Sequence, residues 1–467
     1  MDGLRGAQNH TYGTARFTGM GGAMGALGGD ASVYSTNPAG FGIYRKSELT
    51  LSLGYFNTRT QTTLNQNEVA TRQNNLGLNN IMLVINDQKN TTSGVLSTTW
   101  GLGYNRMANF SSNTTFRDPN PNSTLLDPWQ DRLDQTGDPF ARSFEFDVTP
   151  AYNAFLLDTY QENDRYFHAN ENVEGTMHKE ITRSGSLAEW GGFYSANINN
   201  RFYLGGAVNI VRLNYTENST YREDEFEDAE FSTLREWEFN EELRISGTAF
   251  KLKLGGIYRV NDNLRFGLAY HTPSFITVQD NYETDVRSVF EPENPGDEPM
   301  EEVSFSPEGP LSYMQKQPGR AIASAGIILG KRAIIGLEYE YVNYSNIEFR
   351  DNAGNINFDD LNLDIEEILG ATHNVRTGFE LRFENYFART GYQFRQNPYS
   401  SELEISQNAH TFSIGGGYRK ASFFLDAAYS LTFIDEYPQF IYDPLYINPG
   451  LINRQKGLFV VTAGIRW

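Results

Sequence analysis

The sequence contains no cysteine and has fewer basic than acidic residues, and both shortages limit what the protein can be. Without cysteine, neither a disulfide scaffold nor a cysteine-ligated zinc or iron–sulfur site can form. The 38 lysine and arginine residues face 58 aspartate and glutamate residues, which gives a formal charge of −20. Nucleic acid is therefore not an expected partner, because phosphate backbones are bound mainly through lysine and arginine.

Long apolar runs are also missing. The longest stretches, 321–329 and 457–463, fall well short of the roughly 20 residues that a membrane-spanning helix needs. Residues 1–30 lack a basic stretch followed by an apolar core, so no secretory signal is expected in them. A helical membrane protein is excluded, whereas the length of 467 residues leaves the number of domains open.

Signals for catalysis and for metal binding are absent. No His-Glu-x-x-His zinc pattern, Gly-x-Ser-x-Gly nucleophile elbow or calcium-binding Asp-x-Asp-x-Asp-Gly loop occurs. The six histidines are scattered along the chain, at His10, His168, His178, His271, His373 and His410. We expect no enzyme, no catalytic residue, no metal site and no cofactor, although a composite active site among loop residues stays open.

The dominant pattern from Lys46 onward is alternation with a period of two residues. Leu49, Leu51, Leu53 and Tyr55 share one face, and the same pattern recurs over 333–341 and 375–383. Such alternation indicates strands with two chemically different faces. It predicts fourteen strands, at 47–56, 76–86, 97–109, 184–198, 201–214, 243–259, 263–272, 319–330, 332–347, 372–384, 386–396, 407–419, 421–433 and 457–467.

The connections between these strands alternate in length. Tight turns are expected at 199–200, at 261–262, at Lys331 and near Lys420, and long loops over 110–183, 215–242 and 273–318. An even strand number with short turns at one end is typical of outer-membrane barrels. Only helices and closed barrels can pair every backbone polar group in a bilayer. The sequence therefore predicts an all-β, 14-stranded antiparallel transmembrane β-barrel over 46–467; a soluble propeller or sandwich is the alternative.

The two ends of the chain differ from the rest. Phe459, Val461, Ala463, Ile465 and Trp467 share one strand face, which is similar to the C-terminal signal that the barrel-assembly machinery recognises. Residues 1–45 are instead rich in glycine and do not alternate. We expect them to form an N-terminal hatch that closes the lumen of a wide barrel.

The segment from Gly28 to Gly40 resembles the hatch signature of the FadL/TodX family of outer-membrane transporters for hydrophobic compounds. Asp30-Ala31-Ser32 is followed by Asn37-Pro38-Ala39-Gly40, just before the first strand. The resemblance implies a hatch built on Asp30, Asn37, Pro38, Ala39 and Gly40. It also implies passive uptake of hydrophobic small molecules such as long-chain fatty acids.

In such transporters the ligand leaves sideways, where the third strand bends inward. Carried over to this chain, the bend is expected at Gly101 and Gly103, since glycine inside a strand often marks a kink. No pocket residue can be transferred, because the loops show no alignable motif.

Alternation turns many charged residues towards the lumen. A polar network is expected there, with a polar solute path as the alternative. Its predicted members are Lys251, Lys253, Glu338, Glu340, Arg376, Glu380, Arg382 and Arg389.

The expected loops are strongly acidic, particularly over 221–242 and 280–308. We interpret them as a solvated surface facing outward from a Gram-negative cell, in contact with outer-membrane lipid and lipopolysaccharide. A barrel that serves as an accessory subunit of a larger outer-membrane secretion or assembly complex remains the alternative function, with other outer-membrane proteins as its partners.

Overall fold

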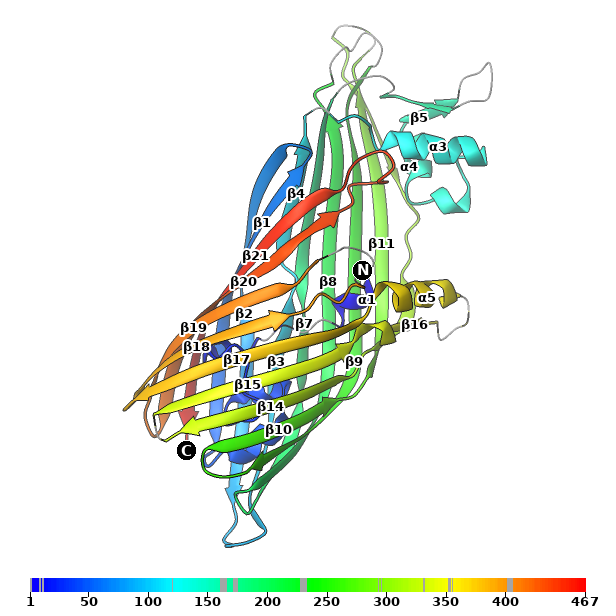
Figure 1. The fold of residues 1–467 in the computed structure, drawn as a ribbon. Helices are drawn as coiled ribbons and strands as arrows, with labels where there is room; N and C mark the ends of the chain where they lie inside the picture. The colour runs from blue at the N-terminus through cyan, green and yellow to red at the C-terminus, as the bar shows by residue number, and fades with distance from the viewer. Residues whose placement is uncertain are drawn as a thin grey trace.

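The chain folds into a closed antiparallel β-barrel (Figure 1). The computed structural model describes residues 2–467 apart from 8, 9, 11, 120, 160–165, 171–174, 227–232, 293, 295, 331, 352, 353, 355 and 401–405. The first strand pairs with the second and also with the last, so that Glu48 lies opposite both Val84 and Arg466 and the sheet has no free edge there. The predicted 14-stranded barrel is confirmed.

Ten of the barrel strands are continuous and four are interrupted. They are β1 (Glu48–Leu64), β2 (Asn67–Gln88), β3 with β4 (Val95–Asn109 and Ser112–Asp118), β7 (Thr176–Ile198), β8 (Phe202–Asp224), β9 (Leu234–Arg259), β10 with β11 (Leu264–His271 and Ser274–Phe290), β13 with β14 (Leu311–Gln317 and Arg320–Leu329), β15 with β16 (Ala333–Asn343 and Glu348–Arg350), β17 (Ala371–Phe383), β18 (Tyr386–Arg395), β19 (Ala409–Arg419), β20 (Phe423–Gln439) and β21 (Gly450–Arg466).

The remaining elements lie inside the barrel or above it. They are α1 (Asp2–Arg5), α2 (Ala15–Gly19), the 3₁₀-helices η1 (Ala31–Ser35) and η2 (Pro38–Ile43), α3 (Leu126–Thr136), η3 (Arg142–Phe144), α4 (Val148–Asn153), the paired β5 (Leu157–Thr159) and β6 (Tyr166–His168), β12 (Met300–Phe305), η4 (Tyr344–Asn346) and α5 (Asp359–Ile368). Among the described residues, no helix is long and apolar enough to cross a membrane.

Short turns join the strands at the end where the chain terminates. Asn199 and Asn200, both with φ of 55°, form the turn between β7 and β8. Ser47 and Trp467 exchange two backbone hydrogen bonds at the same end. The turn expected at Lys331 falls on a residue outside the described part of the chain.

The wall is much taller on one side than on the other (Figure 1). β7, β8 and β9 contain 23, 23 and 26 residues, whereas β17, β18 and β19 contain 13, 10 and 11. The tall strands run far into the segments 110–183, 215–242 and 273–318, which the sequence pattern assigns to loops. Their upper outward positions are polar, as at Arg212 and Asn214 of β8, and the apolar residues Leu213 and Tyr215 lie on the inward face instead. Beyond Tyr215 most residues on both faces are polar, so the alternation fades although the strand continues.

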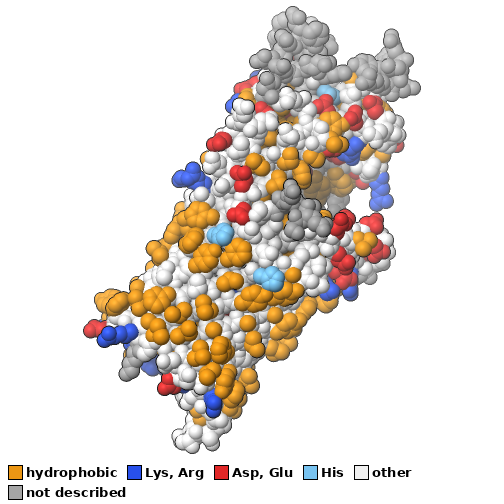
Figure 2. Space-filling model, viewed as in Figure 1, with side chains coloured by type: hydrophobic (Ala, Val, Ile, Leu, Met, Phe, Trp, Pro, Cys, Tyr) orange, Lys and Arg blue, Asp and Glu red, His pale blue; other side chains and the backbone are white. Residues whose placement is uncertain are grey.

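An apolar belt covers the outer face of the lower barrel (Figure 2). Leu49, Leu51, Leu53 and Tyr55 of β1 are all between 40% and 48% exposed, and each neighbouring strand contributes similar side chains. Because each such side chain gains about 1.5–3 kcal/mol when it leaves water, a belt of this extent is stable only in contact with lipid.

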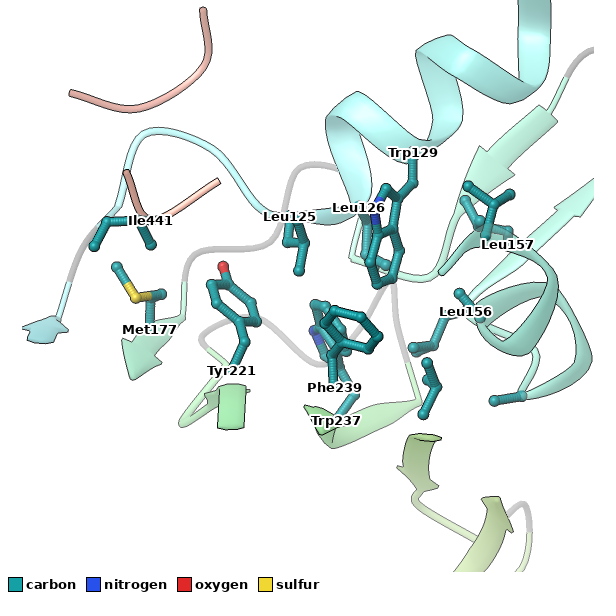
Figure 3. Packing of buried hydrophobic residues seen from close by; sticks show 14 of the residues in the cluster. Leu125, Leu126, Trp129, Leu156, Leu157, Met177, Tyr221, Trp237, Phe239 and Ile441 are labelled. Atoms are coloured by element: carbon teal, nitrogen blue, oxygen red, sulfur yellow. The ribbon is translucent and has the colours of Figure 1, made fainter. Parts of the chain in front are cut away.

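A packed apolar core lies above the membrane, on the tall side of the barrel (Figure 3). Trp129 of α3 contacts Trp237 and Phe239 of β9, with ring centroids 6.0 and 5.1 Å away. We call the segment that contains α3, η3, α4, β5 and β6 the cap. Its buried side chains fix it to the upper strands, so the described part of the 110–183 segment is a folded unit.

Candidate functional site

Asp30 and Asn37 of the hatch signature each cap the start of a 3₁₀-helix. Asp30 Oδ1 accepts hydrogen bonds from the Ser32 backbone, at 2.9 Å, and from the Thr14 hydroxyl, at 2.8 Å. Asn37 Oδ1 accepts one from the Ala39 backbone at 3.1 Å, and Pro38 follows as the first residue of η2. The signature is thus a pair of caps, because aspartate and asparagine satisfy the free N–H groups at a helix start.

These two 3₁₀-helices belong to a segment that lies inside the barrel. We call the described residues between 10 and 45 the lumenal segment. Asn37 donates to the carbonyl of Gly256 on β9, and the Thr36 carbonyl lies 2.7 Å from His271 Nε2 on β10. Ala15 donates to Thr462 of β21 on the other side. Contacts with the inward faces of strands around the barrel show that the segment fills the lumen.

Glycines of the wall let the backbone of the lumenal segment approach closely. A Cβ at Gly378 would lie 2.2 Å from the Met20 carbonyl oxygen, and one at Gly391 the same distance from the Gly21 nitrogen. Such positions tolerate only glycine, because real Cβ atoms do not come that close. They recur on neighbouring strands and form what we call the glycine belt: Gly191, Gly205, Gly255, Gly267, Gly336, Gly378 and Gly391.

Gly40 and Ala39 complete the tight packing of the signature. The Gly40 carbonyl accepts a hydrogen bond from Gly29, and a Cβ at Gly40 would lie 3.0 Å from Val33. The next residue, Phe41, stacks on Phe193 of β7 with ring centroids 3.6 Å apart and planes within 10° of parallel. This contact belongs to a fully buried apolar cluster that joins the lumenal segment to β2 and β7.

Buried ion pairs join neighbouring strands inside the barrel. Arg376 of β17 contacts Glu338 and Glu340 of β15, at 2.5 and 3.2 Å. Arg389 of β18 contacts Glu380 at 2.6 Å and Asp426 of β20 at 2.7 Å. The structure thus brings five predicted members of the polar network together in two groups.

The lumenal segment takes part in the same network. The Gly25 backbone donates to Glu338, and the Arg16 guanidinium donates to Glu380. Lys253 donates both to Glu189 of β7, at 2.6 Å, and to the Tyr34 carbonyl, at 3.0 Å. Glu338, Glu380 and Lys253 therefore contact both the wall and the lumenal segment and hold the segment in place.

Two predicted members lie differently. Lys251 is buried beside Lys253 but forms no ion pair with the residues that the structure describes. Arg382 is exposed near the β17–β18 turn, where it donates to the Glu384 carbonyl. Two participants, Arg16 and Glu189, were not predicted. Glu189 could have been found, because it alternates with Gly191 and Phe193 on the inward face of β7.

The third barrel strand leaves its neighbour half-way up the wall. β2 and β3 pair from Gln88↔Ser97 to Asn80↔Asn105, and above that point β2 pairs only with β1. β4 instead lies against the inward face of the β1–β2 hairpin. The carbonyls of Ser111, directly before β4, and of Asn113 in β4 accept hydrogen bonds from the Thr58 and Thr71 hydroxyls.

Arg106 occupies the point where the two strands separate. Its Nε donates to the Leu78 carbonyl of β2 at 3.0 Å, and its guanidinium lies 5.3 Å from the centre of the Phe56 ring. The register shifts between Arg106 and Ala108, and β3 ends at Asn109. The irregular part of the third strand is therefore 106–111.

Gly101 and Gly103 lie below this point, in the regularly paired part of β3. Gly101 is opposite Val84 and Phe193, and Gly103 is opposite Met82. A Cβ at Gly101 would lie 1.9 Å from the Leu83 carbonyl oxygen. The two glycines permit close packing against β2 and β7, and a role for them in a lateral opening stays a prediction.

A small cavity of about 40 Å³ lies in the lumen beside the separation of β2 and β3. Asn109 of β3 and Phe56 of β1 line it, together with His10, Arg395 and Lys456. This volume holds a few water molecules. Burial lowers the pKa of His10 well below its usual value, and Arg395 and Lys456 lower it further. The His10 Nδ1 accepts a hydrogen bond from Arg395.

No group of three or more histidine, aspartate or glutamate residues that could hold a metal ion occurs among the described residues. His168 contacts Asp127 in the cap, whereas His373 and His410 contact tyrosines on the outer face. The described histidines serve separate local contacts.

The closed barrel, its apolar belt and its filled lumen define an outer-membrane β-barrel. Neither a family model nor a curated protein sequence matches the chain. Solved structures do match it: a FadL homologue from Pseudomonas aeruginosa has 14% sequence identity and a TM-score of 0.59, with 98% of this chain and 99% of that chain covered.

Two toluene transporters are also similar over the same extent, with 98% of this chain and 99% of theirs covered. TodX from P. putida is 10% identical with a TM-score of 0.55, and TbuX from Ralstonia pickettii is 10% identical with a TM-score of 0.53. The chain therefore has the fold of the FadL/TodX family, and the resemblance stated from its sequence is confirmed.

Proposed function

We propose that this protein is a passive outer-membrane channel for hydrophobic small molecules, in which the lumenal segment acts as a hatch. The observation that carries the proposal is the separation of β2 from β3 above Asn80 and Asn105, beside a lumen that the segment fills. A molecule that enters from outside meets the hatch below it, and the side of the barrel is its remaining exit. The similar solved structures, a FadL homologue and two toluene transporters, support this class of cargo.

In this mechanism Arg106 controls the side exit. Its guanidinium satisfies the Leu78 carbonyl that the departing strand leaves without a partner and covers the Phe56 ring. Displacing it opens the gap between β2 and β3 towards the hydrocarbon layer. Hydrophobic molecules such as long-chain fatty acids and monoaromatic hydrocarbons would leave by this path, because transfer of their apolar surface into the hydrocarbon layer is favourable.

Uptake of a hydrophobic probe into lipid vesicles tests the proposal. The full-length protein is reconstituted, and entry of toluene and of oleate is followed by the fluorescence of a dye inside the vesicles. We expect uptake above that of protein-free vesicles, and faster uptake with Arg106→Ala. Arg201→Ala, which removes an exposed arginine at the short-turn end, is the matched control. Uptake no faster than in empty vesicles for both probes would refute the channel.

The alternative function, an accessory subunit of an outer-membrane complex, is favoured by one observation. The cap exposes Phe140 and Phe155, with 62% and 54% of their surface accessible, well above the apolar belt. Exposed aromatic residues outside the membrane are typical of protein-binding surfaces. Co-purification in mild detergent decides between the two: stoichiometric protein partners that are lost with Phe140→Ser and Phe155→Ser would support the subunit.

A further inference from the structure

Arg59 and Arg72 lie directly opposite each other on the outer face of the β1–β2 hairpin. Both side chains are exposed, and neither forms an ion pair with a residue that the structure describes. Like charges in directly opposed positions destabilise a strand pair. Their neighbours on the same face offer no compensating carboxylate: Asn57, Gln61, Ala70, Asn74 and Gln455.

The pair lies just above the apolar belt. Tyr55 and Leu76 are the last large apolar residues on this face, and they too are directly opposed. Arg59 is four residues beyond Tyr55, which places it about 10 Å higher along the membrane normal at about 3.3 Å per residue and the usual strand tilt. This height corresponds to the polar headgroups of the lipid layer.

Several arginines further from the membrane have carboxylate partners. Arg287 of β11 contacts Glu236 and Glu301, at 2.9 and 2.6 Å. Arg212 of β8 resembles Arg59 and Arg72 instead. It follows Ile210, the last apolar residue of its outward face, and lies opposite Ala188 and Thr248. Within the described part of the chain, arginines without an acidic partner thus occur at headgroup height on two parts of the wall.

We propose that Arg59 and Arg72 together bind a phosphate group of a lipid in the outer leaflet. Two guanidinium groups side by side present paired N–H donors to phosphate oxygens, and a doubly charged anion removes the repulsion between them. Since the chain carries a formal charge of −20, phosphate is repelled by most of the molecule, and this pair is a place where contact is attractive. The contact holds the β1–β2 hairpin, whose upper half has a strand partner on one side only, against the lipid.

Binding of lipid A to the purified full-length protein, measured by native mass spectrometry, tests the proposal. We expect Arg59→Gln with Arg72→Gln to weaken lipid A binding at least tenfold. The control, Lys46→Gln with Lys420→Gln, removes the same charge from the exposed short-turn end and should leave binding within twofold. A double arginine variant that binds as tightly as the parent would overturn the proposal.

Two further measurements separate this contact from other sources of binding. Dephosphorylated lipid A should bind as weakly to the parent as intact lipid A binds to the arginine variant; equal affinity for both lipids would mean that acyl chains alone are recognised. Binding should also survive EDTA, because arginine needs no divalent cation to reach phosphate. Complete loss in EDTA would assign the contact to cations bridged by carboxylates and would overturn the arginine site.

Discussion

Arg16 of the lumenal segment and Glu380 of β17 form a two-point ion pair, with Nε–Oε2 and Nη2–Oε1 distances of 2.9 and 3.0 Å. The same carboxylate accepts a hydrogen bond from Arg389, so it is shared between the wall and the segment. Fork-to-fork contacts of this kind add geometric specificity to charge attraction. The pair therefore fixes both the position and the orientation of α2 in the lumen.

Removing Arg16 should loosen the hatch. Breaking a buried pair on one side costs about 3–5 kcal/mol, so Arg16→Ala is expected to raise ion conductance through single barrels in planar bilayers. Arg45→Ala is the control, since Arg45 contacts Asn200 at an exposed position and should leave conductance unchanged. Equal conductance for Arg16→Ala and the parent would show that the pair does not hold the lumen closed.

The glycine belt predicts a second way to displace the hatch. Gly391→Ala places a Cβ 2.2 Å from the Gly21 nitrogen, and overpacking of this kind costs about 1–3 kcal/mol. The thermal unfolding temperature in detergent should fall and conductance should rise. Gly416→Ala should change neither, because its Cβ would find its nearest neighbour, the Phe387 carbonyl oxygen, 3.6 Å away. Identical behaviour of the two variants would contradict the role assigned to the belt.

The cap should detach when its central aromatic contact is removed. Trp129 is 4% exposed between Trp237 and Phe239, and replacing such a residue with alanine costs about 3–5 kcal/mol. Hydrogen exchange followed by mass spectrometry should show faster exchange across α3 in Trp129→Ala. Phe140→Ala, at an exposed position, should leave exchange unaltered; protection that persists in Trp129→Ala would mean that other contacts hold the cap.

Glu223 should make the attachment of the cap depend on pH. Its carboxylate is buried above the membrane. It accepts hydrogen bonds from Thr124 and Asn170, which lie between β4 and β7, both at 2.8 Å, and from Trp237 of β9 at 3.0 Å. Burial raises the pKa of Glu223 above its ordinary value of 4.5. Because the folded-state pKa is the higher one, the protonated form is favoured by folding. This contribution to the free energy of unfolding is complete below pH 4.5 and is lost as the pH rises through the pKa that Glu223 has in the folded protein.

Tryptophan fluorescence during thermal unfolding, recorded from pH 4 to pH 8, measures this dependence. We expect the cap of the parent protein to melt at lower temperature as the pH rises. Glu223→Gln, which keeps an uncharged side chain of the same shape, should flatten the curve. A parent curve that is already flat would mean that the hydrogen-bond donors around the carboxylate offset its burial.

The alternation of apolar and polar residues predicted the strands well where they face lipid and poorly where they extend beyond the membrane. Leu204, Val208 and Ile210 mark β8 because their face must be apolar. Beyond Ile210 the outward face is polar and the apolar residues Val211, Leu213 and Tyr215 lie on the inward face; beyond Tyr215 most residues on both faces are polar, so the pattern carries little signal. Two of the strand interruptions were visible in principle. Pro273 separates β10 from β11, and Pro318 separates β13 from β14, since proline cannot donate to the strand ladder.

The site was predictable in part for a similar reason. The inward positions of Glu338, Arg376 and Arg389 follow from alternation, and the caps Asp30 and Asn37 were found by resemblance. The pairing of Arg16 with Glu380 could not be foreseen, because it depends on how a segment without periodicity folds across strands that are distant in sequence. The position of Arg106 depends in the same way on where the third strand departs from β2.

Because the wall is unequal in height, the two sides of the barrel extend to different distances beyond the membrane. At about 3.3 Å per residue and a tilt of about 40°, the 26 residues of β9 climb roughly 65 Å along the membrane normal and the 10 residues of β18 climb roughly 25 Å. A hydrocarbon layer of about 30 Å covers the short side almost completely, whereas the tall side projects beyond the membrane among the surface sugars as a rigid wall. A molecule that diffuses along the cell surface can therefore reach the barrel opening over β17, β18 and β19, whereas β7, β8 and β9 block its approach.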